Sequence, residues 1–279
     1  MRSTGRQADL TTGWEIARPA RTTVPPGIDM AGFSIRGDSV TELRAIPHPA
    51  VTVVVEFGGH PLAVSDASGR THSGSLAVGL AFDGINARAV GLDCVQVRVS
   101  PVLAHAVLGV PPAELGGTIV ALEDLWARDV ARLRERLHYA PTWQERFALV
   151  DAALSDRLRN GRTVDPEVAW TWRQLQLSHG RSRVGDLATE TGWSRQRLWS
   201  RFGAQIGLTP KRAAMLVRFD RAIHRLADGH TPARVAADGG YADQSHLHRE
   251  VRAFTSTAPT AAAAEPWLAA DHTAWPGIA

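Results

Sequence analysis

The sequence has little cysteine and contains no long apolar run. Its single cysteine, Cys94, excludes an internal disulfide framework and any zinc module built from several cysteines. No apolar stretch approaches the about 20 residues that a membrane span needs. The first residues, MRSTGRQADLTTG, carry basic side chains without an apolar block behind them, unlike a secretion signal. We therefore expect a cytoplasmic protein with no membrane partner, and a structural Cys94 buried in a strand.

Residue patterns typical of enzymes are also lacking. The sequence has no nucleophile elbow, no phosphate-binding loop and no histidines at metal-ligand spacing. The histidines His48, His60 and His72 are scattered, without the paired histidines and glutamate of metal-binding cupins. We therefore expect no catalytic residue, no metal and no cofactor, and we expect that the protein is not an enzyme.

Positive charge is concentrated in the second half of the chain. The formal net charge is only +3. Between Trp170 and Ser256, 14 Lys and Arg residues stand against 7 Asp and Glu residues, so this segment is at +7 and the remainder at −4. A basic block beside an acidic one favours an anionic polymer bound by one half only. A solvated arginine-rich surface is an equally good interpretation of the charge alone.

Short apolar runs separated by Gly, Pro, Asp and Ser extend from Thr41 to Val99. The last run, CVQVRVS, places Val95 and Val97 on one face of a strand. Closely spaced short strands with glycine-containing turns favour a small barrel or sandwich over alternating βαβ units. Residues 1–23 lack this pattern, and we expect them to be a flexible N-terminus.

Helical periodicity replaces the strand pattern after Pro101. Two amphipathic stripes are predicted, one from Leu122 to Leu137 and one from Trp143 to Leu158. Such stripes usually pack on their own domain, but a paired set also forms a dimer seam, and both interpretations stay open. Strands and helices together predict a β-rich domain with a helical end over residues 24–160.

A polar segment, NGRTVD (160–165), marks the boundary between two domains. Asp165 and Pro166 fit the N-cap and the first turn of a new helix. The following residues, 165–260, are predicted to form an all-α domain. The last residues, 261–279, have low complexity and two prolines, and are predicted to be a flexible tail.

The second domain contains a repeat. The segment LATETGWSRQRLWSRFGAQIGLTP (187–210) aligns with VAADGGYADQSHLHREVRAFTSTAP (235–259) when one residue is inserted in the turn. Each copy is predicted to be a helix, a turn at Gly192 or Gly240, and a second helix with Ser194 or Asp243 at its N-cap. Two helix-turn-helix units in register are a much more specific signal than one.

A single helix is predicted between the two units. Phe219, Ile223 and Leu226 recur at helical spacing, and Gly229 ends the pattern. Such a helix holds the two second helices at a fixed separation, so that they enter adjacent major-groove segments about 34 Å apart on one face of B-DNA. Binding to DNA phosphates then explains the excess of basic residues in this half of the chain.

The outward faces of the two second helices carry side chains that bind base edges or phosphates. His246 and His248 lie two residues apart and point in different directions, which argues against a shared metal. The candidates for base contact are Arg195, Gln196, Trp199, Ser200, Gln244, Ser245, His246 and Arg249. The candidates for phosphate contact are Arg197, Arg201, Lys211 and Arg252. For Trp199, packing beneath the linking helix is an equal alternative.

Residues from about Val168 to Pro259 resemble the DNA-binding domain of AraC/XylS-type transcriptional regulators. The matching residues are Ala188, Gly192, Ser194, Leu198, Phe202 and GLTP (207–210) in the first copy, and Ala236, Gly240, Tyr241, Asp243, Ser245, Leu247 and Arg249 in the second. The sequence departs from the family at Ser200, where Arg is frequent, at Val251, where Phe is usual, and at Ser256, where Gly is expected. These departures predict a shifted or weaker contact in the first groove and a less firmly packed second unit.

The resemblance implies an α+β fold, with a small cupin-like β-barrel and following helices before the two helix-turn-helix units. It implies a sequence-specific bacterial transcriptional regulator whose first domain senses an effector or dimerises. The expected partners are double-stranded DNA, a small-molecule effector, a second copy of the chain and, for an activator, RNA polymerase. Two alternatives stay open: an enzyme in the N-terminal barrel, and a protein-interaction scaffold with a helical module of reduced DNA-binding function.

Overall fold

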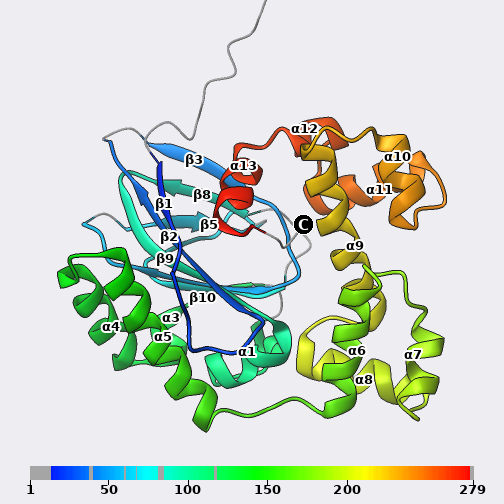
Figure 1. Ribbon diagram of the computed structural model, residues 1–279, viewed down its shortest axis with the longest axis horizontal. Helices are drawn as coiled ribbons and strands as arrows, with labels where there is room; N and C mark the ends of the chain where they lie inside the picture. Colours follow the sequence, from blue (N-terminus) through cyan, green and yellow to red (C-terminus); the bar gives the residue numbers. More distant parts are fainter. Residues whose placement is uncertain are drawn as a thin grey trace, which may run out of the picture.

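A β-rich part with packed helices and an all-helical part make up the computed structural model (Figure 1). The structure describes residues 14–37, 40–59, 61–66, 68–80, 85–115 and 118–276, so His60 lies outside the described residues. The α+β class predicted from the sequence is confirmed. None of the described helices is long and apolar enough to cross a membrane.

Two antiparallel sheets form the β-rich part. The first has the order β1-β2-β9-β4-β7-β10, with β1 (Trp14–Ala17), β2 (Ile28–Ile35), β9 (Leu92–Val99), β4 (Val51–Glu56), β7 (Leu76–Val78) and β10 (Ile119–Ala121). The second has the order β3-β8-β5-β6, with β3 (Thr41–Ala45), β8 (Ile85–Ala89), β5 (Ala63–Ser65) and β6 (Thr71–Ser73). No ladder joins the two sheets within the described residues, so they form an open sandwich. Of the two architectures predicted from the strand pattern this is the second, and the closed cupin-like barrel implied by the family resemblance is not formed among these residues.

Strand β9 is buried on both faces. Val95 and Val97 are fully buried and belong to the core beneath the helices. Because side chains alternate along a strand, Cys94 and Gln96 point the other way and line a pocket between the sheets. Burial raises the pKa of the Cys94 thiol, and the nearby carboxylates of Asp93 and Glu56 add to the effect. The predicted structural role of Cys94 agrees with this environment.

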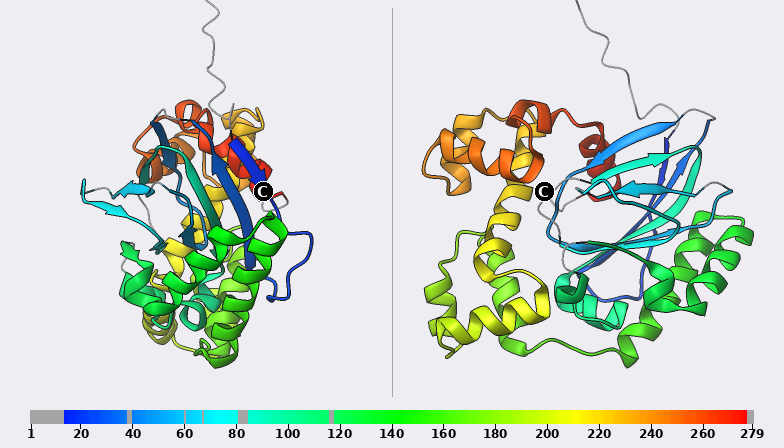
Figure 2. Two further views of the ribbon diagram at one scale, coloured as in Figure 1. Left: turned by 90° about the vertical axis from the view of Figure 1, so that its left-hand side faces the viewer. Right: turned by 180° about the vertical axis from the view of Figure 1, so that it is seen from behind.

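Helices cover the outer face of the six-stranded sheet (Figure 2). They are α1 (Pro101–Leu108), α3 (Leu122–Trp126), α4 (Arg128–Tyr139) and α5 (Trp143–Asn160), whereas the short α2 (Pro112–Leu115) packs against α1 and the all-helical part. The helix predicted from Leu122 to Leu137 is broken, because Ala127 adopts a φ of 49° that ends α3 and redirects the chain into α4. Most of both predicted stripes is buried in the core, including Trp126, Phe147 and Leu154.

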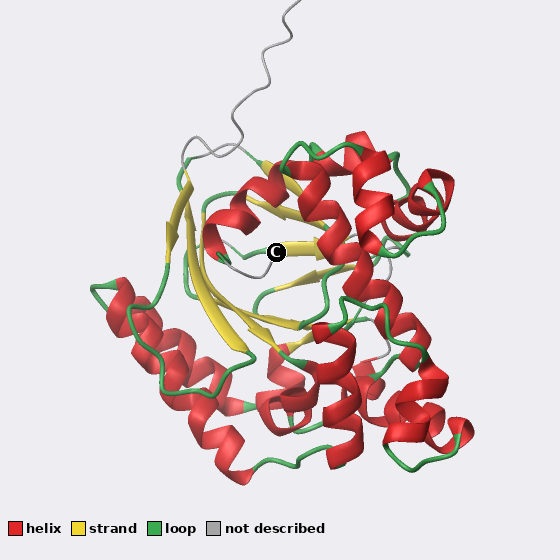
Figure 3. Cartoon of the chain, turned by 45° about the vertical axis from the view of Figure 1, so that its right-hand side comes forward, coloured by secondary structure: helices red, strands yellow, loops and turns green. Residues whose placement is uncertain are grey.

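The all-helical part follows residue 165 (Figure 3). Its helices are α6 (Pro166–Leu177), α7 (Val184–Glu190), α8 (Arg195–Ile206), α9 (Pro210–Ala227), α10 (Pro232–Gly239), α11 (Gln244–Thr255), α12 (Pro259–Ala263) and α13 (Pro266–Ala274). Figures 1 and 2 show the α7–α8 pair and the α10–α11 pair at opposite ends of α9.

Residues 14–23 and 261–276, the described parts of the two segments predicted to be flexible, contact the rest of the fold. Within 1–23, β1 pairs with β2, and the Thr23 N–H donates to Asp151 Oδ1 (2.8 Å). Within 261–279, α13 packs against β1 and β3. The alanine-rich composition suggested a loose tail, but alanine also favours helix, and the buried Leu268 gives α13 an apolar face.

Candidate nucleic-acid interface and apolar pocket

The first helix-turn-helix unit consists of α7 and α8. Gly192 adopts a φ of 68° in the turn, a conformation that favours glycine. Ser194 Oγ then accepts from the Arg197 N–H (3.1 Å) and caps α8. Leu198 and Phe202 lie on the inner face of α8 and are fully buried. These local predictions from the repeat are confirmed.

The second unit, α10 and α11, repeats this construction. Gly240 adopts a φ of 77°, and Asp243 Oδ1 accepts from the His246 N–H (2.7 Å) to cap α11. Val251, the departure from phenylalanine, is nevertheless fully buried. Ser256 adopts a φ of 56° after α11, which explains why a glycine is expected there.

Helix α9 holds the two units apart. Its 18 residues give a length of about 27 Å. Its buried face, which includes Leu216, Phe219 and Ile223, contacts helices of both units, namely α8, α10 and α11. A continuous helix packed at both ends fixes how far apart α8 and α11 lie.

The outward face of α8 carries four residues predicted to contact bases. Arg195, Gln196, Trp199 and Ser200 are all exposed. Trp199 keeps 58% of its surface exposed, so the alternative of packing beneath the linking helix is wrong. The guanidinium of Arg195 lies against Gly185 on α7. The α8 face therefore presents an indole, an amide and a guanidinium together.

The outward face of α11 carries Gln244, Ser245 and Arg249, which are exposed. His246 is placed differently from the prediction, because its side chain is only 36% exposed. Its Nδ1 accepts from the Ala242 N–H (3.3 Å), its ring lies edge-on to Tyr241 (5.4 Å), and its Nε2 lies 4.0 Å from Glu250 Oε2. His246 thus faces its own unit as much as solvent.

The candidates for phosphate contact are exposed but not equally available. Lys211 and Arg252 lie on the surface, and Arg197 lies over the Trp193 ring (4.5 Å). Arg201 instead forms a two-pronged ion pair with Asp165, at 2.8 Å and 2.9 Å. Only Nε and Nη2 of Arg201 are used in this pair, so a phosphate contact made while the pair is intact has to come from the remaining N–H groups.

Asp165 occupies the predicted N-cap position of α6 without making the capping hydrogen bond. Its carboxylate is bound to Arg201 instead. Burial acts to raise the pKa of Asp165, but hydrogen bonds from Gln205 and Arg201 outweigh it and lower the pKa. The same pair joins α8 to the start of α6.

Sequence reasoning missed the ion pair that anchors the second unit. Arg218 on α9 donates through Nε to Glu250 Oε1 on α11 (3.0 Å) and through Nη2 to Oε2. Glu250 is 4% exposed, and the Arg218 guanidinium also lies over the Tyr241 ring (4.8 Å). Burial opposes the charge of Arg218, but its bonds to Glu250 raise its pKa. This pair fixes α11 on α9 below the exposed face.

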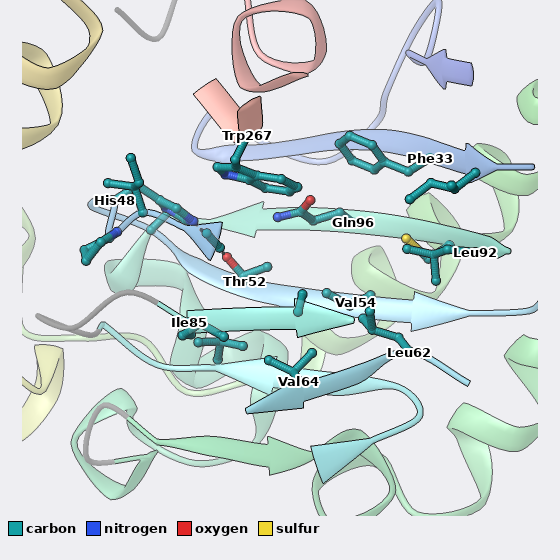
Figure 4. A pocket seen from close by; sticks show the side chains of 18 of the residues that line it. Phe33, His48, Thr52, Val54, Leu62, Val64, Ile85, Leu92, Gln96 and Trp267 are labelled. Atoms are coloured by element: carbon teal, nitrogen blue, oxygen red, sulfur yellow. Dashed lines mark hydrogen bonds between the residues drawn. The ribbon is translucent and has the colours of Figure 1, made fainter. Parts of the chain in front are cut away.

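An apolar pocket lies between the two sheets (Figure 4). Its volume is about 120 Å³. Most of its lining is aliphatic or aromatic, including Phe33, Val54, Leu62, Val64, Ile85 and Leu92. His48, Thr52 and Gln96 also line it, and Trp267 of α13 covers one side. One cavity thus joins the β-sandwich to the C-terminal helix.

A buried polar cluster connects α13 to both parts of the chain. Arg98 on β9 donates to both carboxylate oxygens of Asp271 on α13. Asp271 Oδ2 also lies 3.4 Å from His224 Nε2 on α9, and His224 Nδ1 lies 2.8 Å from His272 Nε2. Burial lowers the pKa of His224 although Asp271 opposes the shift. Helix α13 is therefore held by the sheet and by the linking helix at once.

Asp220 predicts a pH dependence for this junction. Burial raises its pKa from 3.8 to about 7, with Arg98 opposing and Asp271 reinforcing the shift. An acid whose pKa is raised on folding stabilises the native state least when it is ionised, so the stability it contributes is lost as pH rises from about 4 to 7. We expect the free energy of unfolding of the native chain to fall relative to that of Asp220→Asn by on the order of 2 kcal/mol between pH 5 and pH 8. Urea unfolding of both proteins at the two pH values measures this, and a pH-independent difference contradicts it.

Comparison with known proteins identifies the helical part. A family model described as a helix-turn-helix domain matches residues 187–264, from α7 through α12 and so across both units. The C-terminal part of this chain is an AraC-type helix-turn-helix domain. The predicted resemblance to AraC/XylS-type regulators is thereby confirmed for this domain.

A curated relative and solved structures are similar to the chain. The chain is similar to the uncharacterized HTH-type transcriptional regulator YbfI of Bacillus subtilis (strain 168), with 36% identity over 64 residues, which is 23% of each chain. The chain thus matches about a quarter of the length of this relative. ToxT of Vibrio cholerae is similar at 10% identity with a TM-score of 0.47, over 85% of this chain and 98% of ToxT. The AraC-like transcriptional activator CuxR is similar at 14% identity with a TM-score of 0.25, over 80% of this chain and 90% of CuxR.

Proposed function

We propose that the protein is a sequence-specific transcriptional regulator that inserts α8 and α11 into adjacent major-groove segments of double-stranded DNA. The observation that carries this proposal is the pair of capped helices, each with an exposed polar face, held by one linking helix. The basic excess between Trp170 and Ser256 supports it, because neutralised phosphates supply much of the affinity for DNA.

Individual roles follow from the exposed faces. On α8, Gln196 and Arg195 fit adenine and guanine edges, and Trp199 fits thymine methyl groups or sugars. On α11, Arg249 and Gln244 take the corresponding roles, whereas His246 contributes less because it is partly turned inward. Ser200 and Ser245 add single hydrogen bonds. Phosphate contacts are assigned to Arg197, Arg201, Lys211 and Arg252.

Selection of duplex DNA from a random library tests the proposal. The purified chain is expected to select two boxes about one helical turn apart. Gln196→Ala is expected to relax one box and Arg249→Ala the other, because each good base contact supplies about 1 to 3 kcal/mol of discrimination. Lys211→Ala serves as the matched control, since a phosphate contact is expected to weaken binding uniformly and reduce its salt dependence without relaxing either box.

Two outcomes contradict the regulator. Binding without sequence preference favours a module of reduced DNA-binding function, and salt-insensitive association with no DNA binding favours a protein-interaction scaffold.

An enzymatic role for the β-sandwich has no support from its pocket, whose walls are mostly apolar. We assign the sandwich to the binding of a small-molecule effector. RNA polymerase is the expected further partner if the regulator activates transcription.

A homodimer through residues 122–158 stays a prediction. Most of the apolar stripes of α4 and α5 is used in the core, so a seam has to use their outer faces, where Tyr139 is 77% exposed. We expect a dimer in analytical ultracentrifugation at micromolar concentration, weakened by Tyr139→Ala. A monomer at that concentration contradicts the prediction.

A further inference from the structure

The walls of the pocket determine the charge of a ligand that fits it. None of the described side chains that line it is Asp, Glu, Lys or Arg. Burial lowers the pKa of His48 well below its usual value, and the charges of Arg98 and His224 act in the same direction, so the imidazole is neutral. A charged ligand would lose its hydration on entering the pocket and would find no counter-charge there, which is costly in an apolar site. The lining therefore favours an uncharged molecule.

One end of the pocket is polar. Figure 4 shows His48 and Thr52 at one end and Leu62 and Leu92 at the other. His48 Nε2 is bonded to Thr52 Oγ1 (3.0 Å), while His48 Nδ1 is buried without a hydrogen-bond partner among the described residues. An unpaired buried polar atom costs about 1 to 3 kcal/mol. This nitrogen has almost no open surface, so a ligand recovers that energy once the imidazole has turned toward it.

The size of the pocket limits the ligand to a small molecule. A volume of about 120 Å³ is similar to that of apolar cavities of about 150 Å³ that bind benzene. One ring with a hydroxyl group matches this volume and the polar end, and a second fused ring has to extend toward the open side of the pocket.

Helix α13 supplies one wall through Trp267. This indole stacks on Phe33 of β2, with ring centroids 6.0 Å apart and an interplanar angle of 23°. One turn later on the same helix, Asp271 pairs with Arg98 and lies beside His224 of α9. A molecule that packs against Trp267 therefore touches the element that ties the sandwich to the linking helix.

We propose that the pocket binds an uncharged, mostly apolar ring molecule with one hydrogen-bonding group, which bonds His48 and packs against Trp267 as the wall supplied by α13. The bound molecule stabilises α13 in its docked position and so holds α9 and the two helix-turn-helix units relative to the sandwich. The effect on DNA rests on the proposed function, whereas the binding of the ligand does not.

Three probes of one shape test the class of ligand: 1-naphthol, naphthalene and 1-naphthoate. Isothermal titration calorimetry with the full chain is expected to give the tightest binding for 1-naphthol, with 1-naphthoate at least about tenfold weaker, because its carboxylate lacks a counter-charge. 1-Naphthol is also expected to raise the melting temperature by mass action. Equal binding of 1-naphthol and 1-naphthoate, or no binding of 1-naphthol at its solubility limit, overturns the proposal.

Variants test the two named contacts. Trp267→Ala is expected to weaken 1-naphthol binding about tenfold, with Leu177→Ala, an exposed apolar residue of α6, as the unchanged control. His48→Leu is expected to remove the preference for 1-naphthol over naphthalene while naphthalene still binds, which separates the lost hydrogen bond from a damaged fold. Unchanged 1-naphthol binding in Trp267→Ala, or an unchanged preference in His48→Leu, overturns the assignment of that residue and with it the proposal. A chain that binds 1-naphthol but selects no DNA sequence contradicts the proposed function alone.

Discussion

Glu250→Gln is expected to lower the free energy of unfolding by about 3 to 5 kcal/mol, because it leaves the largely buried Arg218 guanidinium without its charged partner. Urea unfolding at neutral pH measures the change. Of the two DNA boxes, only one is expected to be affected. The box read by α11 loses definition, while the box read by α8, which is capped and packed independently, keeps it.

Two further variants test this explanation. Glu42→Gln is the matched control, since the Glu42 and Arg88 side chains pair at 2.9 Å but are 68% and 62% exposed, and exposed pairs contribute little. The double variant Arg218→Met with Glu250→Leu is expected to recover much of the lost stability, because apolar residues replace a buried ion pair at little cost. A Glu250→Gln midpoint equal to that of Glu42→Gln would falsify the anchoring role.

Asp271→Asn is expected to have the second large effect, by releasing α13. The Arg98 and Asp271 side chains are 4% and 5% exposed, so the variant leaves a buried guanidinium without a carboxylate and costs about 3 to 5 kcal/mol. The helix is then expected to detach more readily, because it has lost its ion pair with the sheet. The contacts that remain include the stacked Trp267, the contact of His272 with His224 and the apolar face around Leu268. Limited proteolysis followed by mass spectrometry is expected to show early cleavage within residues 261–279.

Asp156→Asn is the control for this variant. Asp156 pairs with Arg159 on α5, but the two side chains are 71% and 66% exposed. Its urea midpoint and its proteolysis pattern are expected to match those of the native chain. If Asp271→Asn behaves like Asp156→Asn, the pair with Arg98 does not hold α13 in place.

The local geometry of the helix-turn-helix units was predictable from the sequence because it depends on neighbouring residues. Gly192 and Gly240 are in the turns, and Ser194 and Asp243 cap the following helices, since conformation and capping are set within a few positions of the chain. The burial of Leu198 follows equally from helical period.

The missed features depend on residues far apart in the chain. Arg218 and Glu250 are 32 positions apart, and Arg98 and Asp271 are 173 apart, so no local pattern pairs them. His246 is a different case, because the side chains that orient it, Tyr241 and Glu250, are only five and four positions away. Helical period alone places His246 on the outward face, and these local contacts turn it partly inward. Whether Trp199 packs or is exposed required the arrangement of α8 on α9.

The docking of α13 has a consequence for building chimeric regulators from this chain. A single exchange at residue 165 would give the β-sandwich a foreign C-terminal helix and would carry α13 to a sheet that lacks Arg98 and Phe33. The helix-turn-helix units therefore cannot be exchanged with one cut, because α13 follows them in the sequence but packs on the sandwich. A workable hybrid needs two junctions, one near Asp165 and one between α12 and α13 near Glu265, so that the sandwich retains its own α13.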